Sequence, residues 1–185
     1  MALEQLPELI LQSLEDERGG IQIFETALKC IVHEDLRSVW KNYLDQTCKR
    51  ERIQLELGSG LGIDPETQTP ARAAVKQTCV SHVEAMQTVL AAGDPNYAEL
   101  VAYDCVVLTE TKTQSDWEQL ARSVDRLSGA EPSALKAAVE KVESQDVERP
   151  ALLADRCREL WFKVCGIGAV LTAPARGGMS DSGYR

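Results

Sequence analysis

Apolar residues recur along most of the chain with alternating gaps of three and four positions, the spacing that places side chains on one face of an α-helix. No segment alternates apolar and polar positions over a useful length, so the pattern gives no indication of β-strands. Clusters of Gly, Pro, Asp and Ser interrupt the helical pattern, as they do at caps and turns. The pattern predicts five helices, at residues 4–32, 35–57, 70–92, 96–127 and 133–165.

The connections between these helices predict how they pair. The first and second helices meet at a very short turn near residues 33–34, and the fourth and fifth meet near 128–131, so each pair should form an antiparallel hairpin. Two long hairpins joined by a segment with its own helix describe an antiparallel four-helix bundle with an additional crossover helix. We therefore expect one all-α domain over residues 1–174 and a loose Gly- and Ser-rich tail over 175–185.

A polar or charged residue interrupts each apolar seam near its middle. In an antiparallel hairpin, residues equally far from the turn lie at one level, which places Glu17 beside Arg50 and Glu110 beside Arg149. Buried charges are costly unless they are partnered, and the guanidinium group matches a carboxylate in shape. We expect two Glu–Arg pairs inside the bundle. The alternative is that these long side chains lie at the rim of their seams and extend into water.

Four stretches of the sequence resemble rubrerythrin-type members of the ferritin-like superfamily. They are QIFETAL (22–28), YLDQT (43–47), DCVVLTETKTQSDWEQL (104–120) and RELWFKVCGIGAVL (158–171), the last followed by Thr172-Ala173-Pro174. The resemblance implies a four-helix bundle that holds two metal ions. In such bundles each metal takes a glutamate from one helix and an E-x-x-H pair from another.

The chain departs from that ligand pattern, because it contains no E-x-x-H sequence. At positions where the resemblance implies histidine, the second helix has Arg50 and the fourth has Gln114, while the last helix offers Asp146-x-x-Arg149. Arginine cannot ligate a cation, since it stays protonated and has no free lone pair. We therefore expect no metal cofactor and a polar site in the core, formed by Glu17, Arg50, Glu110, Gln114, Asp146 and Arg149.

Two other hypotheses stay open at this point. A hard cation accepts an irregular set of oxygen ligands. Iron or manganese could therefore be held by the acids near this level, namely Glu17, Asp104, Glu110, Glu143 and Asp146. Alternatively, Arg50 and Arg149 could bind a small anionic ligand inside the bundle.

Charge and composition exclude several classes of partner. A net charge of −9 without any basic run argues against nucleic acid or an anionic membrane. No stretch approaches the ~20 apolar residues that span a bilayer, and the first residues lack a signal-peptide pattern. The six scattered cysteines are typical of a reduced, cytoplasmic protein. We expect a homo-oligomeric binding or scaffolding protein without catalytic activity, or else a metal-binding oxidoreductase or metal-handling protein.

Overall fold

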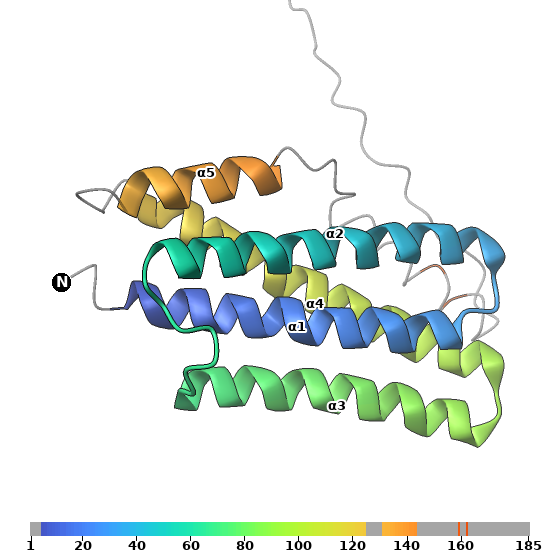
Figure 1. Ribbon diagram of the computed structural model, residues 1–185. Helices are drawn as coiled ribbons and strands as arrows, with labels where there is room; N and C mark the ends of the chain where they lie inside the picture. Colours follow the sequence, from blue (N-terminus) through green and yellow to red (C-terminus); the bar gives the residue numbers. More distant parts are fainter. Residues whose placement is uncertain (1–4, 125–130, 144–158, 160–161, 163–185) are drawn as a thin grey trace, which may run out of the picture.

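The computed structural model describes residues 5–124, 131–143, 159 and 162. Within these residues the chain forms helices and no strand (Figure 1), so the prediction of an all-α fold is confirmed. None of the helices described is long and apolar enough to cross a membrane. The helices are α1 (Leu6–Cys30), α2 (Glu34–Gly60), α3 (Pro70–Ala92), α4 (Pro95–Ser123) and α5 (Glu131–Glu143).

The helix ends follow the local sequence. Helix α3 has the predicted bounds, because Thr69 caps its first turn and Gly93 ends it with a φ of 83°. Asp94 caps α4 in the same way by accepting from two backbone N–H groups. Helix α2 continues three residues past its predicted end, and the backbone first turns left-handed at Gly62. The rest of the predicted fifth helix, after residue 143, falls almost entirely outside the described residues.

Helix α1 lies at the centre of the structure. It packs against α2, α3 and α4, while α4 also packs against α3, and α5 contacts both α2 and α4. In Figure 1, α1 runs between α2 and α3, with α4 behind it. The short turn between α1 and α2 confirms the first predicted hairpin. The connection between α4 and α5 lies largely outside the described residues.

Two adjacent glycines allow the neighbours of α1 to approach its backbone closely. A Cβ atom added to Gly19 would overlap Cys79 of α3. A Cβ atom on Gly20 would lie 3.2 Å from Cγ2 of Thr47 in α2 and 3.6 Å from Cγ2 of Thr109 in α4. The middle of α1 is therefore held close to three other helices at once.

Apolar side chains form two clusters at opposite ends of the helices. One cluster contains the aromatic stack of Phe24 on Tyr43, with ring centroids 5.9 Å apart, and an edge-on contact of Trp40 with Tyr103 at 5.0 Å. The second cluster lies near the N-terminal end of α1 and includes Leu6, Ile10, Leu57, Trp117, Leu120 and Leu135. The sequence between these clusters on α1, α2 and α4 carries the polar residues described below.

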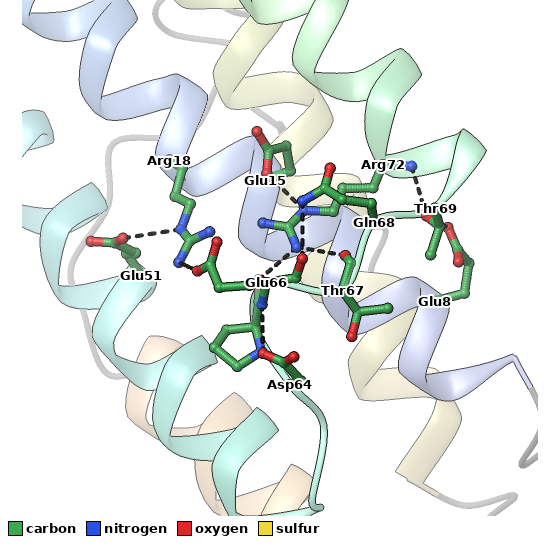
Figure 2. Close-up of polar contacts among 11 residues, drawn as sticks. Glu8, Glu15, Arg18, Glu51, Asp64, Glu66, Thr67, Gln68, Thr69 and Arg72 are labelled. Carbon is green, nitrogen blue, oxygen red and sulfur yellow. Dashed lines mark hydrogen bonds and ion pairs between the residues drawn. The ribbon is translucent and has the colours of Figure 1, made fainter.

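The connection from α2 to α3, residues 61–69, is tied to α1 by polar contacts (Figure 2). Arg72, which is only 2% exposed, donates from Nη1 to the carbonyl oxygens of Pro65 and Thr67 at 2.6 and 2.8 Å. Its Nε donates to Glu15 of α1 at 2.8 Å. Arg72 thereby fixes where α3 begins relative to α1. Figure 2 also shows the outer contacts of this connection, Arg18 with Glu51 and Glu66, and Thr69 with Glu8.

Candidate functional site

Three charged side chains from three helices meet in the middle of the bundle. Glu17 of α1, Arg50 of α2 and Glu110 of α4 are 0%, 3% and 4% exposed. Arg50 Nε donates to Oε1 and Oε2 of Glu17 at 2.9 and 3.0 Å, and its Nη2 donates to Oε1 of Glu110 at 3.0 Å. One guanidinium group therefore joins two carboxylates. We refer to Glu17, Arg50 and Glu110 as the core charge cluster.

Neighbouring donors and acceptors complete this cluster. The indole Nε1 of Trp117 donates to Oε1 of Glu17 at 2.8 Å, so the Glu17 carboxylate accepts from two N–H groups, of which that of Arg50 Nε is shared between both carboxylate oxygens. Arg50 Nη2 also donates to the hydroxyl of Thr47 at 3.0 Å. Protein N–H donors therefore contact both oxygens of the Glu17 carboxylate.

The electrostatics of the cluster set its protonation. Burial raises the pKa of Glu17 to about 7, although Arg50 and the indole of Trp117 act in the opposite direction and Glu110 acts in the same one. Burial alone would lower the pKa of Arg50, but the carboxylates of Glu17 and Glu110 raise it. Arg50 therefore stays charged, while burial makes Glu17 easier to protonate than an exposed glutamate.

The structure shows one of the two predicted Glu–Arg contacts and does not describe the arginine of the other. The predicted contact of Glu17 with Arg50 is present, and Glu110 joins them through the same guanidinium group. The predicted partner of Glu110 was Arg149, which lies outside the described residues, as does Asp146. Sequence reasoning missed that a single arginine reaches both carboxylates.

Gln114 departs from the prediction that placed it in the core. Its side chain is exposed and donates to Glu118 at 3.1 Å. The buried face of α4 is centred near Thr113 and Trp117. Gln114 is rotated about a quarter turn around the helix axis from that centre. Thr113, one residue earlier, is buried at that level instead.

The remaining acids proposed as metal ligands do not gather at the cluster. Asp104 is half-buried and lies nearly two turns from Glu110 along α4, and Glu143 is exposed at the end of α5. Among the residues that the structure describes, no three His, Cys, Asp or Glu side chains are grouped so that they could hold a metal ion. The described acids therefore do not assemble the carboxylate-only centre considered above.

Another buried acid was not singled out from the sequence. Glu99 of α4 is 0% exposed, and its Oε1 accepts from the backbone N–H groups of Val32 and His33 at 3.2 and 3.0 Å. Its Oε2 lies 2.6 Å from Nδ1 of His33. Glu99 therefore fastens the turn between α1 and α2 to α4. The sequence signal was the spacing of Glu99, which lies three and four positions before the apolar residues Ala102 and Tyr103 and therefore shares their buried face.

A shallow apolar groove lies between α4 and α5. Its volume is about 280 Å³, and Trp117, Ala121, Val139 and Val142 form its apolar wall. The indole of Trp117 lines this groove and also donates to Glu17. The Trp117 side chain therefore contacts both the groove and the core charge cluster.

The cysteines of the described residues do not form a reactive centre. Cys30, Cys48, Cys79 and Cys105 are free thiols. Burial raises the pKa of Cys79 to about 12, so this thiol stays protonated at neutral pH and is a poor nucleophile. Burial lowers the pKa of His82, one turn further along α3.

Comparisons of this chain with protein-family models, with curated proteins and with solved structures find no match. The resemblance to the ferritin-like superfamily therefore depends on the sequence stretches quoted above.

Proposed function

We propose that this protein is a ferritin-like helical bundle in which the core charge cluster takes the place of a dimetal centre, and that it acts as a non-catalytic binding or scaffolding protein. The observation that carries the proposal is the guanidinium group of Arg50, which is bonded to Glu17 and Glu110 together. In a dimetal bundle, inward-facing glutamates such as Glu17 and Glu110 would instead hold the metal ions.

Electrostatics supports this exchange of a metal for arginine. A dication at about 4 Å from a guanidinium group would be repelled by about 8 kcal/mol at an effective dielectric constant of about 20. Binding would also require the displacement of the N–H donors that now occupy Glu17. Arg50 itself offers no lone pair to a metal. The protein's own cation, Arg50, therefore balances one of the two carboxylate charges of the cluster.

The other buried acids support a structural role as well. Within the described part of the chain, Glu15 is bonded to Arg72, and Glu99 is bonded to His33 and to two backbone N–H groups. These carboxylates are engaged in holding helices together, which leaves them poorly placed to act as a general base on a substrate. A rigid bundle with satisfied core charges suits a protein that presents its surface to partners.

Metal analysis and an activity assay test the proposal. Protein purified without chelator from cells supplied with iron and manganese should contain far less than one metal ion per chain. It should also oxidise Fe(II) no faster than buffer alone. The Arg50→His variant places an imidazole where the sequence resemblance implies a histidine ligand. Its metal content is compared with that of Arg18→His, the matched control outside the cluster. One or more tightly bound ions per wild-type chain would contradict the metal-free proposal.

The binding or scaffolding role predicts assembly. Light scattering coupled to size-exclusion chromatography should show a stable homo-oligomer. A monomer at all concentrations would contradict the oligomeric part of the proposal while leaving the metal-free core in place. The two parts can therefore fail separately.

A further inference from the structure

A second group of charges lies between α1 and α4, outside the core charge cluster. Lys112 Nζ donates to Oδ2 of Asp16 at 2.8 Å and to both carboxylate oxygens of Asp116 at 2.6 and 2.7 Å. The side chains of Asp16 and Asp116 are 8% and 3% exposed, whereas that of Lys112 is 45% exposed. Two buried carboxyl groups from different helices therefore share one ammonium group at their open side. We call Asp16 and Asp116 the carboxyl pair.

The charge of this group is not balanced when both acids are ionised. Two carboxylates then face a single ammonium group, which leaves one negative charge in a buried position. Helix α3 presents the uncharged thiol of Cys79 near Asp16. The charged groups that α3 and α2 direct toward α1 are engaged with other partners, Arg72 with Glu15, Arg50 with Glu17 and Glu110, and Glu51 with Arg18.

We propose that the buried carboxyl pair holds one proton between its two carboxyl groups, which makes the contact between α1 and α4 sensitive to pH. With the proton present, one carboxyl group donates to the other and Lys112 balances the remaining negative charge. When the proton leaves, two like charges face each other across the helix interface. The contact is therefore tighter on the acidic side of neutral pH and looser on the basic side.

The surroundings of Asp16 favour its protonated form, as the proposal requires. Burial raises the pKa of Asp16 from 3.8 to about 7, a hydrogen bond with Asp116 acts in the same direction, and Lys112 opposes them. The folded protein then holds a proton that the unfolded chain releases at lower pH. The contribution of the pair to stability is therefore fully present below about pH 4 and is lost as the pH rises through about 7.

Side-chain carboxyl NMR on the intact protein tests the proposal directly. We expect the carboxyl carbon signal of Asp16 to show a titration step near neutral pH. In Asp116→Asn, the pKa of Asp16 should fall by about one unit or more, because its like-charged neighbour is gone and Lys112 remains. Glu118→Gln, an exposed change on the same helix, should leave the step in place. Carboxyl signals that stay ionised throughout pH 5–9 in the wild-type protein would overturn the proposal, even if no variant folds.

Amide hydrogen exchange tests the consequence for the helices. After correction for intrinsic exchange rates, protection around residues 112–116 should fall as the pH rises through neutral in the wild-type protein, and this fall should vanish in Asp116→Asn. Burial also raises the pKa of Glu17 to about 7, so the same measurement on Glu17→Gln separates the two groups. The proposal holds if Glu17→Gln keeps the pH-dependent fall, and it fails if Asp116→Asn keeps it too.

Discussion

Replacing Arg50 with methionine removes the one cation that joins Glu17 and Glu110 while keeping most of the aliphatic side chain. The variant loses both hydrogen bonds to Glu17 and the one to Glu110, and it leaves two carboxyl groups in a site where each is less than 5% exposed. Removing one partner from a buried ion pair costs about 3–5 kcal/mol. We expect a loss in that range at pH 8, where the two carboxyl groups must either stay charged without a partner or take up protons from dilute solution.

The same variant should be less damaging in acid. The pKa of Glu17 is already raised to about 7 by burial, so at pH 5 this group can be neutral in the folded state. Urea unfolding at pH 5 and pH 8, followed by circular dichroism, measures both values. Lys49→Met is the matched control, because Lys49 is the exposed neighbour on α2 and should change stability by less than about 0.5 kcal/mol.

Two outcomes would refute this reasoning. A loss of under about 1 kcal/mol at pH 8 would mean that Arg50 is not the partner of buried carboxylates. An equal loss at both pH values would mean that the protonation of Glu17 does not take part. The triple variant with Glu17→Gln and Glu110→Gln should recover much of the stability lost in Arg50→Met, because it removes the unpartnered charges.

Three further predictions follow from other contacts. The free energy of unfolding should decrease between pH 5 and pH 8, because the pKa of Glu17 is raised from 4.5 to about 7 in the folded protein. In Glu17→Gln the free energy of unfolding should depend less on pH, and an unchanged dependence would contradict the role of Glu17. Gly19→Ala should lower the melting temperature, because the added Cβ overlaps Cys79 and the strain outweighs the helix preference of alanine; an equal or higher melting temperature would show that α3 can move away. Glu99→Ala should cost about 1–3 kcal/mol in urea unfolding, because two backbone N–H groups and His33 lose their acceptor; a loss no larger than that of the exposed control Glu84→Ala would contradict the role of Glu99.

The sequence predicted the helices and one of the core contacts because both depend on local geometry. Apolar spacing and proline-containing caps such as Asp94-Pro95 mark helix positions. The short turn between α1 and α2 fixes the relative levels of the two helices, so Glu17 and Arg50 could be matched by their distance from it. Such an argument works only for neighbours along the chain.

The contacts that were missed join helices that are not consecutive. Arg50 reaches Glu110 across the interior because Gly20 allows α1 to approach both Thr47 of α2 and Thr109 of α4. Matching residues by their distance from a turn relates only the two helices of one hairpin, so it does not predict a contact that involves three helices. Glu99 was missed for the same reason, since its partner His33 lies 66 residues away in the chain.

Gln114 was misplaced for a different reason. A helix face defined by apolar spacing can be rotated by one position without losing its pattern, and on α4 that rotation decides whether Gln114 or Thr113 points inward. The structure places Trp117 against Glu17, where its indole supplies both apolar surface and a hydrogen bond.

The Nε–H signal of Arg50 in proton–nitrogen NMR spectra tests most directly the proposal that arginine takes the place of a metal centre. With the guanidinium group bonded to Glu17 and Glu110, this signal should be slow to exchange with water and should keep its position and width when one equivalent of Mn²⁺ is added. Loss of the signal to paramagnetic broadening at one equivalent would place the ion beside Arg50 and contradict a metal-free core.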